Sequence, residues 1–224
     1  MATPGFPLPL RNALAELVCD ALEGEDSHAA LAWLTEPHGP PPAAAARRLA
    51  AVHLIDPGGS TLLAVHAPWD AAVQTHAERG LRAAAAHRAH GGTTTDTVAH
   101  AVAQAAALWE QALFFEVHEV LEVVWQREGG ARRQALQGLI QVAVAFHHLA
   151  HGNPRGARTL LREGRARLAG SPAGTLPWLD VDQLLQATAP WEAALARDAG
   201  GPMPAGPPPH LVPRRDGGDP VAGG

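Results

Sequence analysis

The sequence predicts an all-α fold, a compact antiparallel helical bundle, preceded by a small mixed α+β region at the N-terminus. Apolar residues recur at helical spacing over residues 93–197, and short glycine- or proline-containing connections favour antiparallel neighbours. Within residues 1–92, two short apolar runs flank the turn-forming cluster 56–60, which is the pattern of a β-hairpin. Residues 198–224 are rich in proline and glycine and almost free of large apolar groups, so they are predicted to be disordered.

The N-terminal region is predicted to contain four helices and the hairpin. Leucines at helical spacing indicate a first helix over residues 10–24, and Ser27 is a candidate N-cap for a second helix over 27–36. A proline-rich break ends at Pro42 and a third helix follows it. After the hairpin, residues 68–90 are predicted to be helical again, as far as Gly91 and Gly92.

Helix, helix, helix, hairpin is also the element order of a winged helix. Arg47 and Arg48 would then lie on its third helix. The region has few basic side chains, although phosphate contacts dominate affinity for DNA. An accessory region of unknown role is therefore the favoured interpretation of residues 1–92.

The bundle region is predicted to contain five helices. Several candidate N-caps begin the first helix near residue 93, and the stretch FFEVHEVLEVVW, residues 114–125, follows it as the second. Gly129 and Gly130 mark a stop, and a long helix ends near Gly152. Pro154 suits the first turn of the fourth helix, and a closing helix begins near residue 180.

The stretch 114–125 places ionisable groups among apolar ones, which is costly unless the groups are paired, hydrogen-bonded or metal-bound. On a helix each residue advances by about 100°, so His118 and Glu122 share a face with Phe115 and Trp125. Such a pair can bind one divalent ion through an imidazole nitrogen and a carboxylate oxygen. Glu119 lies at the edge of this face. Glu116 is expected to point elsewhere, either nearer solvent or at the start of the helix.

A further ligand must come from a neighbouring helix. On the next helix, His147 is expected to face the same pocket, and His151 lies one turn beyond it. Gln137, Gln141 and His148 form an adjacent stripe, in which Gln141 could orient a carboxylate or a water molecule. The competing interpretation is that the His–Glu pair is a charge-assisted hydrogen bond with no metal.

These two helices together resemble a known family. The pattern H-x-x-x-E-x-x-W occurs as His118, Glu122 and Trp125. The next helix continues the pattern with Leu136, Gln137, Gly138, Gln141, His147, Gly152, Asn153, Gly156 and Leu160. Over residues 100–197 the chain resembles the bacterial and archaeal domain-of-unknown-function family 309. The resemblance implies a compact all-α bundle and a metal role for the His118/Glu122 motif, in a family with no agreed reaction.

One departure from the family pattern concerns the turn before the aromatic pair. Members usually have asparagine or glycine there, whereas this chain reads EQALFF, residues 110–115. The two helices are therefore expected to meet through a tighter or more continuous connection.

Two functional hypotheses follow. In the first, the protein is a metal-dependent hydrolase in which His118, Glu122 and His147 bind zinc or another first-row ion. Glu119 would then be a further ligand or a general base acting on metal-bound water. In the second, the protein is a non-catalytic interaction module whose histidine, glutamate and glutamine residues form an internal hydrogen-bond network.

Composition narrows the partners and the compartment. The chain of 224 residues has a net charge of -5, which disfavours nucleic acid, and one cysteine, Cys19, which excludes an intrachain disulfide framework. No apolar run is long enough for a membrane span and no secretory signal is recognisable, so a cytoplasmic protein is expected. Homo-oligomerisation stays open, and so does the identity of any small-molecule substrate.

Four arginines recur along one face of the fourth bundle helix, at Arg155, Arg158, Arg162 and Arg165. A solvated outer face is the favoured interpretation, and an anion-binding surface is the alternative. Under the first interpretation these side chains contribute little to stability.

Overall fold

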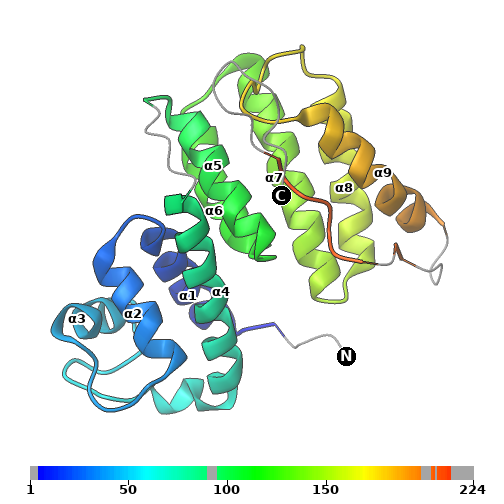
Figure 1. Cartoon of the computed structure of the whole chain (residues 1–224). Helices are drawn as coiled ribbons and strands as arrows, with labels where there is room; N and C mark the ends of the chain where they lie inside the picture. The colour runs from blue at the N-terminus through cyan, green and yellow to red at the C-terminus, as the bar shows by residue number, and fades with distance from the viewer. Residues whose placement is uncertain (1–4, 90–94, 198–202, 205, 213–224) are drawn as a thin grey trace. The chain divides into compact units, whose positions relative to one another are not determined.

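The computed structural model describes residues 5–89, 95–197, 203–204 and 206–212 (Figure 1). These residues divide into two compact units, one ending at Ala89 and the other beginning at Thr95. The described residues form nine α-helices and one 3-10 helix and contain no strand, which confirms an all-α fold. Among these helices, none combines the length and the apolar character needed to cross a membrane.

The N-terminal unit consists of four α-helices and the 3-10 helix. They are α1 (Leu8–Ala21), α2 (Glu25–Thr35), α3 (Ala43–Ala51), η1 (Ala64–Trp69) and α4 (Asp70–Ala89). Helix α2 packs against α1, α3 and α4, so the core of the unit surrounds its apolar face. Leu31 and Leu34 of α2 are buried there together with Leu14 and Leu17 of α1. As the sequence predicted, α3 begins directly after Pro42.

The predicted hairpin is wrong. The turn itself forms, since Gly59 N donates to Asp56 O at 2.8 Å, and Leu63 N donates across it to Leu54 O at 2.9 Å. The chain then enters η1 instead of extending the pairing. Leu54 and Ile55 are buried in the helical core, so these short apolar runs gain more from packing against helices than from a two-stranded ladder. Without the hairpin, the winged-helix order is not present either.

Ser27 is not the N-cap of α2. That position belongs to Gly24, and Ser27 lies buried inside the helix, where it accepts a hydrogen bond from Arg48 Nε at 2.9 Å. Arg48 also contacts Glu16, at 2.8 Å, and Asp20. Burial lowers the pKa of Arg48, but hydrogen bonds and charges from the two carboxylates outweigh it and raise the pKa overall. Arg48 therefore joins α1, α2 and α3 inside this unit.

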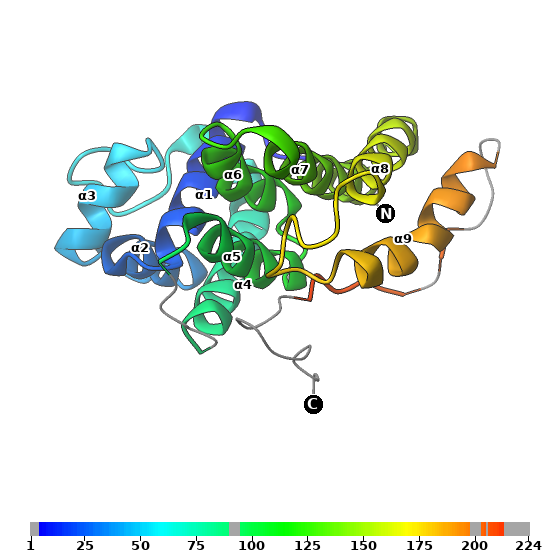
Figure 2. The same ribbon diagram turned by 90° about the horizontal axis from the view of Figure 1, so that it is seen from above.

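The second unit contains α5 (Thr97–Glu110), α6 (Phe114–Trp125), α7 (Gly130–Ala150), α8 (Pro154–Ala169) and α9 (Val181–Ala196). Each helix packs on the next along the chain, and α7 and α8 make the most extensive contact (Figure 2). Side chains cap three of the helices at their first turns. Asp96 accepts from Val98 N and Ala99 N, Asn153 accepts from Gly156 N, and Asp180 accepts from Gln183 N.

Four aromatic side chains pack together inside this unit. The ring centroid of Phe146 lies 5.4 Å from that of Trp109, 5.7 Å from Phe114 and 5.3 Å from Trp191. Trp109 and Phe114 are also in contact, at 5.1 Å. These side chains come from α5, α6, α7 and α9, so the cluster fixes helices that are distant in the sequence.

The connection between α5 and α6 is a short turn containing a left-handed residue. Ala112 is the left-handed residue, with φ 52°. Gln111 N and Leu113 N donate to Leu108 O, at 3.1 and 3.0 Å, and Ala112 N donates to Trp109 O at 2.8 Å. The expected tight connection is thus made by alanine in a conformation that costs L-residues about 1–2 kcal/mol.

We predict that Ala112→Gly stabilises the protein by about 0.5 kcal/mol. Glycine removes the cost of the left-handed conformation, and the larger entropy of glycine in the unfolded chain, about 0.4–1 kcal/mol, offsets part of that gain. Urea unfolding measures the difference. The matched control is Ala193→Gly, at an exposed position inside α9, where the same change should destabilise by up to about 1 kcal/mol. A loss of stability at both positions would contradict the prediction.

The predicted disorder of residues 198–224 needs correction for the segment 206–212. Leu211 is only 2% exposed, and Pro209 O accepts a hydrogen bond from Trp109 Nε1 at 2.6 Å. One large apolar anchor suffices here because a proline-rich backbone has little conformational freedom to lose on docking. Residues 198–202, 205 and 213–224 lie outside the described residues.

Candidate metal site on helix α6

Helix α6 presents its ionisable side chains where its apolar face ends. Val117, Val120, Leu121 and Val124 are buried at helical spacing, so the face they define points into the bundle. The side chains of His118, Glu119 and Glu122 are 25%, 42% and 38% exposed, respectively. They form a half-buried cluster at the surface of the second unit.

His118 lies between the two carboxylates. Its Nδ1 atom is 3.1 Å from Glu119 Oε1, and its Nε2 atom is 3.4 Å from Glu122 Oε2. One ligand atom from each residue can be chosen so that all three lie within 4.8 Å of one another. His118 and Glu122 share a face, as the sequence predicted, and Glu119, expected at the edge of that face, belongs to the same group.

His147 contacts Phe115, the same ring that contacts His118. The ring centroid of Phe115 is 5.8 Å from that of His118 and 5.7 Å from that of His147. His147 also contacts two histidines of its own region, with centroids 4.3 Å from His151 and 6.2 Å from His148. The group of three close ligand atoms contains His118, Glu119 and Glu122 but not His147.

Glu116 lies in the first turn of α6, as one of the two expectations stated, but only 2% of its surface is exposed, so the other expectation, that it lies nearer solvent, is wrong. The reason is helix geometry: Glu116 lies one turn before Val120, on a face that is buried throughout. Its carboxyl group therefore belongs to the interior of the unit and not to the exposed cluster.

Trp125 is the last residue of α6, and the side chain of Arg133, which the sequence did not point to, packs over its ring. The guanidinium of Arg133 lies 3.9 Å from the ring centroid of Trp125. Arg133 Nη1 also donates to the carbonyl oxygens of Trp125 at 3.0 Å, Glu128 at 3.3 Å and Gln126 at 3.4 Å. Arg133 thus satisfies carbonyls at the C-terminus of the helix that carries the cluster. The sequence feature that could have predicted this contact is an arginine shortly after Gly129 and Gly130, where the helix was expected to end.

Two of the predicted site residues of α7, Gln141 and His148, contact α8 or the turn before it. Gln141 Nε2 donates to Glu163 Oε2 at 3.2 Å, and Gln141 Oε1 accepts from Arg167 Nε at 3.0 Å. Gln141 therefore does orient a carboxylate, but that carboxylate belongs to α8. His148 Nδ1 lies 3.1 Å from Asn153 Nδ2 at the turn between the two helices. Gln137 is half-buried on the same helix.

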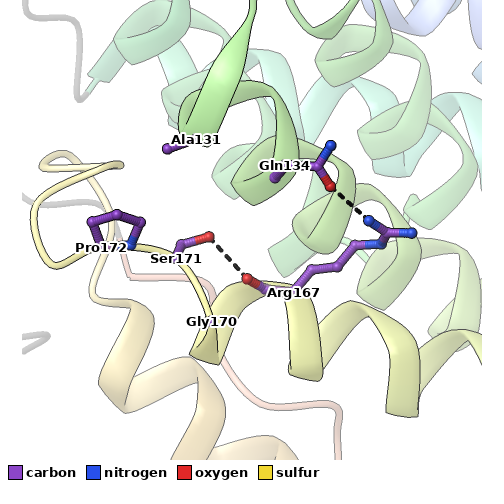
Figure 3. Close-up of a pocket in the computed structure, with 6 residues that line it drawn as sticks. All are labelled: Ala131, Gln134, Arg167, Gly170, Ser171 and Pro172. Carbon is purple, nitrogen blue, oxygen red and sulfur yellow. Dashed lines mark hydrogen bonds between the residues drawn. The ribbon is translucent and has the colours of Figure 1, made fainter.

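A shallow pocket of about 290 Å³ lies at the other end of this helix pair (Figure 3). Its lining residues are Ala131, Gln134, Arg167, Gly170, Ser171 and Pro172. Arg167 Nη1 donates to Gln134 Oε1 at 2.6 Å, and Ser171 Oγ donates to Arg167 O at 2.8 Å, so the polar groups that line it bond to one another. None of the predicted site residues lines this pocket.

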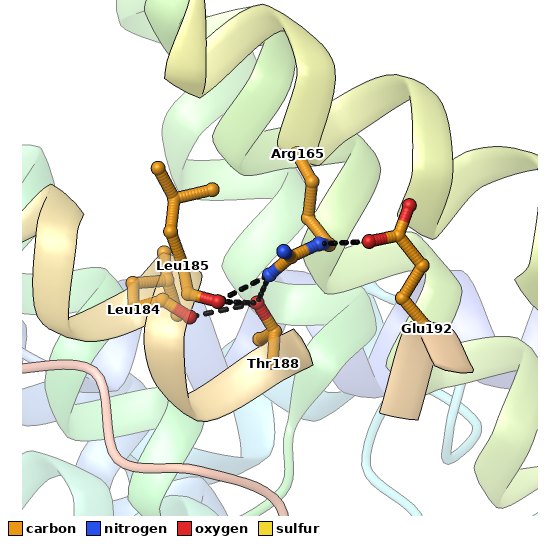
Figure 4. A network of polar contacts seen from close by, with 5 residues as sticks. All are labelled: Arg165, Leu184, Leu185, Thr188 and Glu192. Atoms are coloured by element: carbon orange, nitrogen blue, oxygen red, sulfur yellow. Dashed lines mark hydrogen bonds and ion pairs between the residues drawn. The ribbon is translucent and has the colours of Figure 1, made fainter. Parts of the chain in front are cut away.

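The arginine face of α8 is divided between solvent and the interior. Arg155, Arg158 and Arg162 are exposed, as a solvated face requires. Arg165 instead reaches α9, where its Nε atom is 2.6 Å from Glu192 Oε2 (Figure 4). Its Nη1 atom contacts Leu185 O and Thr188 Oγ1. The expectation of one solvated stripe is therefore wrong for Arg165.

Comparison with known proteins agrees with the resemblance seen in the sequence. The family model "Domain of unknown function (DUF309)" matches residues 102–160, which run from α5 into α8 and include the α6 cluster. An uncharacterised protein of Aquifex aeolicus (strain VF5) is 29% identical over 65 residues. That match covers 29% of this chain and 20% of the relative, so the chain spans about a fifth of its length. No solved structure matches the chain.

Proposed function

We propose that this protein binds a divalent metal ion between His118 Nε2 and Glu122 Oε2. The separation of these two atoms, 3.4 Å, is the observation that carries the proposal. Ligand bonds of about 2.1 Å at a tetrahedral angle separate a nitrogen and an oxygen ligand by about 3.4 Å. A charge-assisted hydrogen bond between the same atoms would be shorter, about 2.7–2.9 Å.

In this proposal Glu119 orients His118. Histidines that bind metals usually donate their second ring N–H to a carboxylate, which fixes the tautomer and the ring orientation. The 3.1 Å contact between Glu119 Oε1 and His118 Nδ1 lacks the geometry of a hydrogen bond, so this role requires Glu119 to turn toward Nδ1 when the ion binds, which leaves the Nε2 lone pair for the ion. This role differs from the two that the sequence alone suggested for Glu119, a further ligand or a general base.

Metal-dependent hydrolysis is the reaction class that fits such a site. Two protein ligands leave coordination positions for water, and a bound divalent ion supplies Lewis acidity to that water. The partial exposure of Glu119 and Glu122 leaves the cluster open to a substrate. His147 is the candidate for a third ligand, because Phe115 contacts both His147 and His118. Zinc or another first-row metal suits mixed nitrogen and oxygen ligands.

A non-catalytic interaction module is the second candidate, and one observation favours it. Glu163, Gln141, Arg167 and Gln134 form a continuous chain of hydrogen bonds between α7 and α8. The α6 cluster would then be another polar network, in which His118 is held by two carboxylates without an ion.

The change in melting temperature of the tag-free protein on addition of metal distinguishes the metal site from the interaction module. An ion at 100 times its Kd should stabilise the wild type by about 2.7 kcal/mol, and His118→Ala and Glu122→Gln should abolish the increment. Glu119→Gln should retain a site with affinity lower by about 10–100-fold, as expected of an orienting residue. His147→Ala tests the third ligand.

The matched control is His38→Ala, an exposed histidine of the N-terminal unit, which should melt and respond like the wild type. The measurement is made with zinc, manganese and nickel, together with elemental analysis of the purified protein. If none of the three metals shifts the wild-type melting temperature and no metal copurifies, the hydrogen-bond network is the better account.

A further inference from the structure

Residues 206–212, Gly-Pro-Pro-Pro-His-Leu-Val, run back alongside α9 in the direction opposite to that helix (Figure 2). This segment carries no regular secondary structure, yet it makes backbone and side-chain contacts with two helices of its own unit. The contacts lie at the C-terminal end of α5 and at the N-terminal end of α9.

The residues of α5 that contact this segment are Trp109 and Glu110. The indole Nε1–H of Trp109 donates to the carbonyl oxygen of Pro209 at 2.6 Å. His210 Nδ1 lies 2.7 Å from Glu110 Oε2, and the side chains of these two residues are 72% and 39% exposed. The Trp109 hydrogen bond is part-buried and involves only the backbone of the segment. The contact between His210 and Glu110 is exposed to solvent, and an exposed ion pair contributes little to stability.

The α9 side is made by the backbone before that helix. Asp180 N donates to Val212 O at 3.2 Å, while the Asp180 side chain caps α9. Between the two backbone contacts, Leu211 is almost completely buried. The segment is thus held by two hydrogen bonds, in which carbonyl oxygens of the segment accept from α5 and from the residue before α9, and by the buried side chain of Leu211.

This arrangement has the features by which proteins recognise proline-rich peptides. Consecutive prolines restrict φ, so the extended chain loses little entropy on binding, and its carbonyls have no partners within the segment. Aromatic residues with an N–H donor read such carbonyls, and an apolar side chain next to the prolines supplies specificity. Trp109 and the site of Leu211 fill these two roles.

We infer that the surface between Trp109 and Asp180 is a recognition site for extended Pro-Pro-His-Leu peptides, occupied in cis by residues 207–212. The site is independent of the metal proposal. A segment tethered in the same chain has an effective concentration on the order of millimolar, so it outcompetes a weak external peptide. A protein partner carrying the same sequence chemistry binds only when the internal segment is displaced.

The test uses the full chain with Leu211→Asp, which removes the anchor of the internal segment. A fluorescein-labelled peptide of sequence GPPPHLV should bind this variant at least about 10-fold more tightly than it binds the wild type, by anisotropy. The same peptide with aspartate in place of leucine should not bind. The matched control is Met203→Asp, an exposed tail position, which should behave like the wild type.

Two further measurements separate docking from a general loosening of the fold. The indole N–H resonance of Trp109, assigned by its loss in Trp109→Phe, should shift in Leu211→Asp and return on addition of the peptide. Adding Trp109→Phe to Leu211→Asp should weaken peptide binding about 10-fold if the indole hydrogen bond reads Pro209. Equal peptide affinity for the wild type and Leu211→Asp, or none for either, would overturn the inference.

Discussion

Replacing Gly138 with alanine should destabilise the protein by about 2 kcal/mol, although alanine is the better helix former. Gly138 lies on α7 opposite Gly164 on α8. A Cβ atom at Gly138 would meet Gly164 O at 2.8 Å and Leu168 Cγ at 3.0 Å. A Cβ atom at Gly164 would meet Gly138 O at 2.7 Å and Val142 Cγ2 at 2.9 Å. The two helices therefore touch backbone to backbone.

Two effects of opposite sign decide the result. Alanine gains about 1 kcal/mol over glycine in a helix interior. Overpacking costs about 1–3 kcal/mol and occasionally more, and here the contacted atoms include backbone carbonyls that cannot rotate away. Since α7 and α8 form the most extensive helix contact, separating them also loosens their neighbours. The steric cost should win at both glycines.

Urea unfolding of Gly138→Ala, Gly164→Ala and the double variant measures these effects. The double variant should lose less than the sum of the two, because one separation of the helices relieves both clashes. Gly129→Ala is the control, since Gly129 has an extended backbone and open space around it. Alanine is a poorer N-cap than glycine, but it lowers the entropy of the unfolded chain. These opposing effects should leave the free energy of unfolding of Gly129→Ala within about 0.5 kcal/mol of the wild-type value. Wild-type stability for Gly138→Ala would disprove the close approach.

Arg165→Ala should also cost about 2 kcal/mol. The Arg165 side chain is 15% exposed and is shared among Glu192, Leu185 O and Thr188 Oγ1, all on α9 (Figure 4). Thr188 is fully buried. Pro190 has no N–H to donate in the same helix, so this part of α9 depends more on side-chain contacts.

The magnitude follows from what each partner loses. Hydrogen bonds to charged groups contribute about 1.5–3 kcal/mol. Glu192 is 34% exposed and can be hydrated once Arg165 is gone, so the cost stays below the 3–5 kcal/mol found for fully buried pairs. Chemical denaturation checks the value, and a double-mutant cycle with Glu192→Gln isolates the ion pair.

Arg162→Ala is the matched control for Arg165→Ala. Arg162 lies on the same helix three residues earlier and is exposed, so its removal should change stability by less than about 0.5 kcal/mol. If both arginines prove equally dispensable, the whole stripe is a solvated face, as the sequence alone suggested.

Helix existence and helix faces followed from the sequence because they depend on residues close in the chain. The break at Pro42, the acidic cap before Thr97 and the apolar period of α6 act within a few residues. The proximity of His118 and Glu122 is equally local, since residues four apart on a helix always share a face. For this reason the pairing of His118 with Glu122 could be predicted, and the resemblance to family 309 was recognisable from the same residues.

What each helix face meets depends on residues far away in the chain, and only the tertiary structure decided it. Arg162 and Arg165 have the same spacing pattern, but α9 lies over one of them alone. Glu116 is buried and His147 lies across Phe115 because of the way α6 and α7 pack. Leu54 and Leu211 are each buried against helices of their own unit. This burial stabilises the fold more than a local hairpin at Leu54 or an undocked tail at Leu211 would.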